Sequence, residues 1–392
     1  MDRDYTSKPI AEDWQPSTQL QTWFFDKFKQ ALAIQEFLKL NSSISIINGQ
    51  KRIKNILKKN TYKEDLHFNQ ALCSEGAELE LSENFKQLDK KGCYLILTNS
   101  NNEIIKKLQD MGVDSVSDCG GSATNSLVAA SNYGSNCHHV CRVANDEDGK
   151  KYLDSLEAAG VKHIGFSKGD SNLPTGKCLI FVTPDAKRTM SSMLGISAHL
   201  GPMDIDYDAV DNSKIFYIEG YMVTSEENYN AVKSVLEHLQ DKDILKALSL
   251  SDAGIVQGFM DKFKEIESYK IDMIFGNDDE AIAFSESDSL EKAIEFFKKQ
   301  SYMTIITKGA EGSIVIKDGE EIFSPAMQIS PIDTNGAGDI FAGSFMHAYL
   351  QGHSLSECAE FSNLASSRVV ETFGPRLDTN GYKEVLNNLK KS

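Results

Sequence analysis

The segment DTNGAGD, residues 333–339, runs directly into the apolar stretch IFAGSFM, residues 340–346. Gly336 and Gly338 around Ala337 permit a tight turn whose backbone N–H groups converge where a helix begins, and the helix dipole adds positive potential there. Asp339, in the first helical turn, would face the same spot and take a proton from an attacking hydroxyl. The plainer alternative is a glycine turn followed by an acid that favours the helix N-terminus. Seven specified positions favour a site for phosphoryl transfer.

A second glycine-rich segment, DCGGSATN, occupies residues 118–125. Gly120 and Gly121 precede an expected helix at 122–133, and bare backbone there would let a ribose or sugar approach closely. Asn125, in the first turn of that helix, can hydrogen-bond to the hydroxyls of such a ligand. The alternative is an ordinary helix start in which Ser122 is the N-cap.

Together the two segments resemble the signatures of the ribokinase/PfkB family, Asp-Thr-x-Gly-Ala-Gly-Asp near the C-terminus and Gly-Gly-x-x-x-Asn near the N-terminus. Other runs are similar to the bacterial adenosine-kinase-like branch of that family, namely 176–190 (GKCLIFVTPDAKRTM), 218–221 (IEGY), 277–280 (NDDE), 307–309 (TKG) and 373–377 (FGPRL). The resemblance covers roughly residues 65–382. It implies a ribokinase-like α/β fold, in which helices sandwich a mainly parallel sheet and a small β-sheet lid covers the substrate.

The resemblance also implies roles for single residues. Asp339 would be the catalytic base and Gly336, Ala337 and Gly338 the anion hole, while substrate would contact Gly120, Gly121, Asn125, Ser74 and the lid residue Arg188. ATP would contact Thr307, Gly309, Gly312 and Asn363, and Mg²⁺ would be held through water near Asn277 and Glu280. Each position also has a structural alternative: an acid-rich helix start at 277–280, a strand-to-turn transition at 307–312, a surface arginine at 188, and core packing at 363.

One departure from the family pattern concerns the first strand. The family begins that strand with Gly-Asn-x-x-x-Asp, whose aspartate anchors sugar hydroxyls, whereas the counterpart here is NQALCS at residues 69–74. Ser74 therefore occupies the aspartate position unless the neighbouring Glu75 substitutes for it. A lost charged acceptor would cost about 1.5–3 kcal/mol per hydrogen bond.

Length and net charge indicate the size of the fold and the kind of partner to expect. The chain has 392 residues, 41% of them hydrophobic, which is enough for one large α/β domain or two smaller ones. A net charge of −16 argues against a nucleic-acid partner.

The N-terminus lacks the apolar core of a signal peptide and no run reaches 18 apolar residues, so we expect an intracellular protein without a membrane span. Seven cysteines without C-x-x-C pairs favour buried free thiols over a metal cluster.

The chain divides into an N-terminal extension, residues 1–60, and a body, residues 61–392. The extension has apolar residues at helical spacing over 18–40 and then a basic stretch at 51–59, which either docks on the body or binds a partner or anionic membrane surface. In the body, apolar runs at 94–97, 139–141, 215–218, 247–250, 273–275 and 304–307 predict strands, and 226–239 and 288–300 predict helices. Residues 176–194 predict a hairpin that would form the lid with residues 75–85.

Three functions remain open from the sequence. The leading one is an ATP-dependent kinase that transfers the γ-phosphoryl group to the 5′-hydroxyl of a nucleoside, most simply adenosine, with Mg²⁺ carried by the nucleotide. The alternatives are a sugar or sugar-phosphate kinase on the same scaffold and a catalytically weak relative that binds or regulates through its extension.

Overall fold

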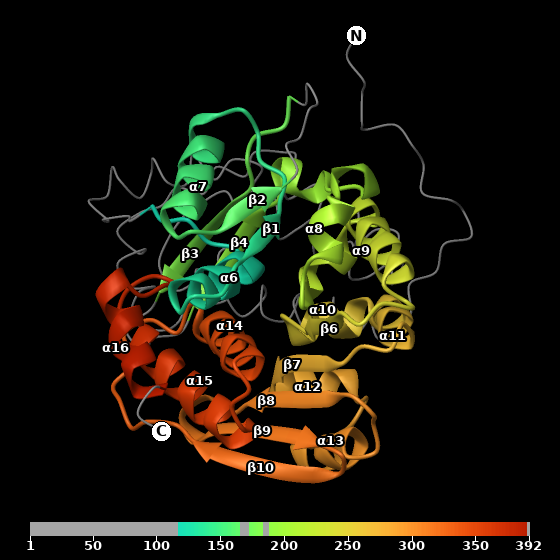
Figure 1. The fold of residues 1–392 in the computed structure, drawn as a ribbon, viewed down its shortest axis with the longest axis vertical. Coiled ribbons are helices and arrows are strands. Elements are labelled where there is room, and N and C mark those ends of the chain that lie inside the picture. Colours follow the sequence, from blue (N-terminus) through green and yellow to red (C-terminus); the bar gives the residue numbers. More distant parts are fainter. Residues whose placement is uncertain (1–116, 165–171, 183–187, 390–392) are drawn as a thin grey trace, which may run out of the picture. The chain divides into compact units, whose positions relative to one another are not determined.

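The computed structural model describes residues 117–164, 172–182 and 188–389 (Figure 1). The expected extension with its boundary near residue 60, the strand at 94–97, the altered segment 69–74 and the lid residues 75–85 lie outside the described residues. They stay predictions. In the described part of the chain, no helix combines the length and the apolar character needed to cross a bilayer.

Within the described residues, a six-stranded sheet forms the centre of the fold, with strand order β10-β9-β8-β7-β6-β5. Its strands are β5 (Ile215–Glu219), β6 (Leu245–Ser249), β7 (Met273–Asn277), β8 (Met303–Thr307), β9 (Gly312–Lys317) and β10 (Glu320–Pro325). The four strands from β5 to β8 are parallel, as expected from the sequence. The last two are antiparallel because the chain turns back twice without an α-helix between the strands. The second turn contains Asp318 and Gly319, both with positive φ (52° and 81°), which suits a two-residue hairpin.

Alternate side chains of the central strands enter two separate cores. On β6, β7 and β8, the residues Ala247, Met273 and Ile305 pack into one core. Their neighbours Leu248 and Ile274 pack into the other. Because successive side chains of a strand point to opposite faces, both faces of this sheet are covered, as in a parallel sheet of an α/β protein.

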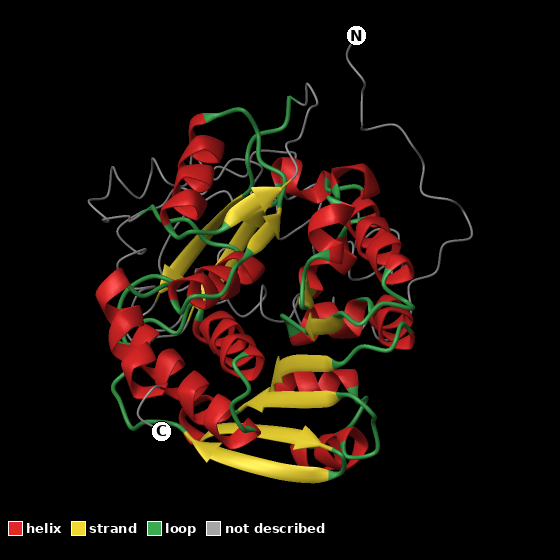
Figure 2. Cartoon of the chain, viewed as in Figure 1, coloured by secondary structure: helices red, strands yellow, loops and turns green. Residues whose placement is uncertain are grey.

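Helices supply the outer layer of each core (Figure 2). The first core contains buried residues of α6 (Ser122–Asn132), α14 (Ala337–Leu350), α15 (Leu355–Val369) and α16 (Thr379–Leu389). The second contains buried residues of α9 (Glu226–His238), α10 (Ala253–Gly258), α11 (Met260–Ser268), α12 (Asp278–Phe284) and α13 (Leu290–Phe297). The helices predicted at 226–239 and 288–300 are therefore confirmed as α9 and α13. The described chain also contains α7 (Glu147–Ala158), α8 (Tyr207–Asp211) and the parallel pair β1 (His138–Val140) and β2 (Lys162–Ile164).

The hairpin predicted at 176–194 is present as β3 (Lys177–Val182) and β4 (Arg188–Met193), which pair antiparallel. Two glycines close its base, where the chain passes near itself. A Cβ at Gly195 would lie 2.2 Å from the carbonyl oxygen of Pro174, and one at Gly176 would lie 2.7 Å from that of Leu194. The hairpin thus leaves the body through a base that tolerates no side chain at these two positions.

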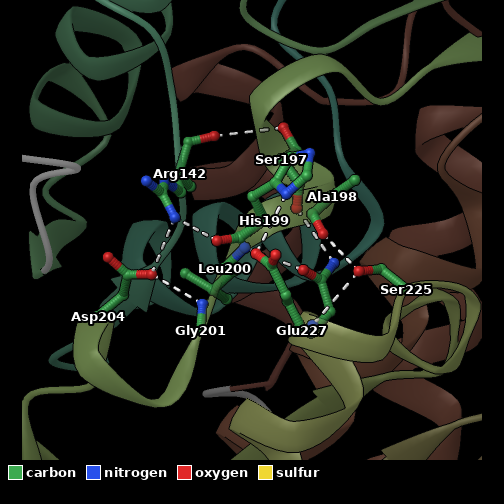
Figure 3. Close-up of polar contacts among 10 residues, drawn as sticks. Arg142, Ser197, Ala198, His199, Leu200, Gly201, Asp204, Ser225 and Glu227 are labelled. Atoms are coloured by element: carbon green, nitrogen blue, oxygen red, sulfur yellow. Dashed lines mark hydrogen bonds and ion pairs between the residues drawn. The ribbon is translucent and has the colours of Figure 1, made fainter. Parts of the chain in front are cut away.

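Polar contacts fasten the segment after the hairpin to the start of α9 (Figure 3). Arg142 donates to the carbonyl oxygen of His199 and forms an ion pair with Asp204 at 3.5 Å. The buried amide of Asn228 accepts from the N–H of Leu200 at 3.0 Å and donates to the Ser197 carbonyl at 3.1 Å. This anchoring fixes where β4 returns to the body.

Helices α6 and α14 cross at a point of backbone contact, and this contact makes a prediction about stability. A Cβ at Gly343 of α14 would lie 2.1 Å from the carbonyl oxygen of Ser126 in α6. Gly343→Ala must push the helices apart, and we expect it to lower the free energy of unfolding by about 1–3 kcal/mol, measured by urea titration. Gly201→Ala is the control, since its nearest neighbour stands at 3.9 Å. Equal stability of the two variants would contradict the close approach.

Candidate active site

The carboxyl ends of the parallel strands bring polar side chains to one edge of the sheet. Glu219 at the end of β5 is in register with Ser249 of β6, and Asn277 at the end of β7 is in register with Thr307 of β8. Ligands of open α/β sheets bind at this edge, because loops and helix N-termini gather there. Asn277, predicted to lie near Mg²⁺, and Thr307, predicted to contact ATP, are thus neighbours on adjacent strands.

The glycine turn before α14 has the conformation that its sequence predicts. Gly336 is the N-cap residue with φ 76°, and a Cβ there would lie 2.4 Å from the Pro375 carbonyl oxygen. The buried carboxylate of Asp333 accepts from the N–H groups of Asn335 (2.8 Å) and Gly374 (3.0 Å) and so holds the turn against the loop that contains Pro375. Next to Gly338, by contrast, a Cβ would meet no atom within 4 Å. The turn is rigid on one side and open on the other, as an anion site at a helix N-terminus requires.

Asp339 is held by two donors from α6. The Ser122 hydroxyl donates to its Oδ1 at 2.7 Å, and the Asn125 amide donates to its Oδ2 at 2.8 Å. These contacts join the two glycine-rich segments, which are more than 200 residues apart in the chain. The structure therefore brings Asp339, Asn125 and the glycine turn together, and their roles in catalysis and substrate binding stay predictions.

The start of α6 differs from the structural alternative considered for it. Gly121, with φ 108°, is the N-cap residue, and no side chain caps the helix. The interpretation of Ser122 as the N-cap is therefore wrong, because its hydroxyl is directed to Asp339. A Cβ at Gly121 would approach the Thr124 hydroxyl to 2.8 Å, whereas the space beside Gly120 is open.

Glu219 adds a second carboxylate to the site. Its Oε2 accepts from the backbone N–H of Ala123 at 2.8 Å, in the first turn of α6. Burial raises the pKa of Glu219 to about 7; the Ala123 hydrogen bond opposes this rise, and the negative charge of Asp339 adds to it. A half-buried acid that titrates near neutrality beside a candidate base is typical of an active site.

Asn277 and Glu280 form a reciprocal cap at the start of α12. The Glu280 N–H donates to Asn277 Oδ1 (2.8 Å), and the Asn277 amide donates to Glu280 Oε1 (2.7 Å). Burial raises the pKa of Tyr221, and the charges of Asp252, Glu219, Glu280 and Asp339 raise it further. Because Asn277 ends β7, this cap lies at the same carboxyl edge of the sheet as Glu219, which ends β5. The oxygens of Glu280 are hard donors already engaged by Asn277, an arrangement that fits contact with Mg²⁺ through water rather than directly.

The glycines after β8 have different environments. Gly309 (φ 53°) has open space where a Cβ would stand. Gly312 (φ 121°) is required by its backbone, because a Cβ there would lie 2.1 Å from the Ser324 carbonyl oxygen. Thr307 donates to the Gly276 carbonyl at 3.5 Å. Contact of these three residues with ATP phosphates stays a prediction, and Gly312 has in addition a clear structural reason.

For three other predicted site residues, the described contacts give no support to the predicted role in binding. Asn363 is buried in α15, where its amide donates to the Ser324 carbonyl (2.9 Å) and lies near the Ser313 hydroxyl (3.1 Å), so that it ties α15 to the β9–β10 hairpin. Arg188 begins β4, as expected for the lid, but its side chain is outside the described part. Ser74 also lies outside the described residues.

Two residues of this site, Glu219 and Arg376, lie in runs that resemble the family but were not predicted to be site residues. Glu219 belongs to the run IEGY, and Arg376, whose Nε donates to Asn125 Oδ1 at 2.8 Å, belongs to FGPRL. The position of Glu219 at the end of an expected strand, directly before a glycine, was the available signal. For Arg376 no local signal existed, because its partner is 251 residues away.

Comparisons with known proteins agree with this geometry. The family model described as pfkB family carbohydrate kinase matches residues 71–380. Adenosine kinase 2 of Arabidopsis thaliana is 27% identical over 59% of this chain and 71% of that relative. A 2-dehydro-3-deoxygluconokinase of Thermoproteus tenax is 26% identical over 65% of this chain and 80% of that relative. The crystal structure of adenosine kinase from Sinorhizobium meliloti has a TM-score of 0.70 at 28% identity and covers 77% of this chain and 93% of its own. Since the family model spans most of the chain, this protein belongs to the pfkB family of carbohydrate kinases, phosphotransferases whose acceptor is an alcohol group.

Proposed function

We propose that the protein is an ATP-dependent nucleoside kinase that phosphorylates the 5′-hydroxyl of adenosine or a closely related nucleoside. The observation that carries the proposal is the position of Asp339, held by Ser122 and Asn125 beside Glu219 at the open end of the α14 turn. The adenosine kinases among the similar proteins support the choice of a nucleoside.

In this proposal each site residue has a separate role in the reaction. Asp339 takes the proton of the acceptor hydroxyl, and its two donors keep the carboxylate in one orientation. The N–H groups of the turn at Gly336–Gly338 stabilise the charge that spreads over the transferring phosphoryl oxygens. Glu219 offers a further acceptor for a hydroxyl of the same substrate. MgATP, when bound, supplies the phosphoryl group and neutralises its charge, and Glu280 would orient the waters of the metal.

A sugar kinase is the second candidate, favoured by the similarity to the Thermoproteus tenax enzyme. The two candidates differ in what must fill the acceptor pocket. A nucleobase buries an aromatic ring that a free sugar lacks, and such burial is worth several kcal/mol of binding free energy.

We predict that adenosine has a higher kcat/KM than ribose or fructose 6-phosphate. The measurement is ADP release by the purified protein with ATP, Mg²⁺ and each acceptor, and the Asp339→Asn variant in the same assay corrects for contaminating activity. A higher value for a sugar would replace the nucleoside assignment with the second candidate. Absence of ADP release with every acceptor would indicate the third possibility, a catalytically weak relative.

A further inference from the structure

The guanidinium of Arg376 contacts the oxygen of the same amide whose nitrogen contacts Asp339. Arg376 lies between α15 and α16, and its Nε donates to Asn125 Oδ1 at 2.8 Å. Its Nη1 donates to the Ser155 hydroxyl of α7 at 3.0 Å. Asn125 is only 3% exposed, and its Nδ2 donates to Asp339 Oδ2 at 2.8 Å. Arg376, Asn125 and Asp339 thus form a continuous chain of hydrogen bonds that ends at the candidate base.

The chemistry of arginine fixes the orientation of this amide. A guanidinium only donates hydrogen bonds, so the atom of Asn125 that faces Arg376 must be the oxygen. A flipped amide would set its NH₂ group against the guanidinium and its oxygen against the carboxylate of Asp339. Both contacts would then be repulsive and both hydrogen bonds lost. Arg376 therefore stabilises the same orientation of Asn125 that the carboxylate of Asp339, which only accepts hydrogen bonds, requires.

The partners of Arg376 are unusual for a charge in a largely enclosed position. Its hydrogen bonds go to an amide and a hydroxyl, and within the described ranges no carboxylate forms an ion pair with it. Its charge reaches the half-buried His139, whose pKa falls to about 4, first through loss of hydration and then through Arg376 and His163. An arginine used for charge pairing would have an acid beside it. Here the guanidinium serves as an oriented donor.

We propose that Arg376 is a positioning residue for phosphoryl transfer, which acts through Asn125 by locking the amide that holds the carboxylate of Asp339. The proposal rests on the proposed function, in which Asp339 is the base. It requires neither a nucleoside nor a sugar as acceptor, so the test can use whichever acceptor the ADP-release screen identifies.

The test is a double-mutant cycle between Arg376 and Asn125. Arg376→Ala should lower kcat by about 10- to 100-fold, the range expected when one charge-assisted hydrogen bond to the base is lost. The KM values for ATP and acceptor should stay within about threefold, since neither substrate loses a contact. In the Asn125→Ala background, Arg376→Ala should have almost no further effect on kcat. Guanidinium added to Arg376→Ala should restore part of the turnover.

Ser155→Ala is the matched control. It removes the other acceptor of Arg376 without touching Asn125, so kcat should stay within about threefold of the unmodified protein. If the alanine variant does not fold, Arg376→Gln and Arg376→Met replace it: glutamine keeps a neutral donor, so it should retain more turnover than methionine, which has none.

Three outcomes would overturn the proposal. Additive effects in the cycle would show that Arg376 acts independently of Asn125. A raised KM for the acceptor at unchanged kcat would show direct substrate contact by the buried Nη2, which has no hydrogen-bond partner among the described residues. Unchanged turnover of folded Arg376→Ala would show a role in stability alone. Failure of the proposed function is distinguishable, because Asp339→Asn would then keep its turnover.

Discussion

Replacing Asp339 with asparagine is expected to lower turnover by about 100- to 10,000-fold, the range for loss of a general base. The amide has nearly the shape of the carboxylate but cannot accept the proton of the acceptor hydroxyl. Binding of ATP should stay within a few fold, because the N–H groups of the glycine turn are retained. Single-turnover kinetics with a nucleotide-binding measurement would separate the two quantities.

The local network predicts that Asp339→Asn folds. The new amide oxygen can accept from Asn125, and the new NH₂ group can donate to the Ser122 hydroxyl, so Ser122 and Asn125 each keep a hydrogen bond to this side chain. We therefore expect a melting temperature close to that of the unmodified protein. Near-normal turnover in a folded Asp339→Asn protein would show that another group is the base, and Glu219 would be the first to examine.

Motifs with a local physical cause were predictable from the sequence. The glycine turn was one, since only glycine takes φ 76° at position 336 without cost. The parallel strands were another, because the apolar runs at 215–218, 273–275 and 304–307 have the length and composition of buried strands. The hairpin at 176–194 followed from a turn signal between two such runs.

Features that depend on distant partners could not be predicted in the same way. The sequence does not state that the Ser122 hydroxyl turns away from its own helix toward Asp339, or that Arg376 reaches Asn125. The antiparallel strands β9 and β10 form a different case. Their Asp318-Gly319 turn is a short-range hairpin signal that the sequence itself contains.

Asn277, Glu280 and Asn363 show why motifs alone do not settle roles. Each satisfies neighbouring backbone or side-chain groups in the structure, Asn277 and Glu280 as a cap and Asn363 as a buried tie. Such contacts suffice to explain the residue types without a ligand. Their assignment to Mg²⁺ and ATP therefore stays a prediction that ligand-bound measurements must test.

Gly336→Ala is expected to have the second-largest effect, because it changes the turn that would hold the phosphoryl group. A left-handed φ costs a non-glycine residue about 1–2 kcal/mol. The added methyl group would also overlap the Pro375 carbonyl oxygen, 2.4 Å from the Cβ position, so the turn must move. If its N–H groups stabilise the transferring charge, displacement should lower kcat by about 100- to 1,000-fold, measured by ADP release at saturating substrates.

Gly352→Ala separates the catalytic effect from backbone strain. Gly352 follows the other end of α14, has a similar φ of 85°, and has open space around its Cβ position. It should lose about the same 1–2 kcal/mol of stability from strain while kcat stays within about twofold. Because α14 has 14 residues, roughly 21 Å of helix lie between this position and the turn. Equal turnover of the two variants would mean that the phosphoryl group does not bind at Gly336–Gly338, whereas a selective loss at Gly336 would locate transfer there.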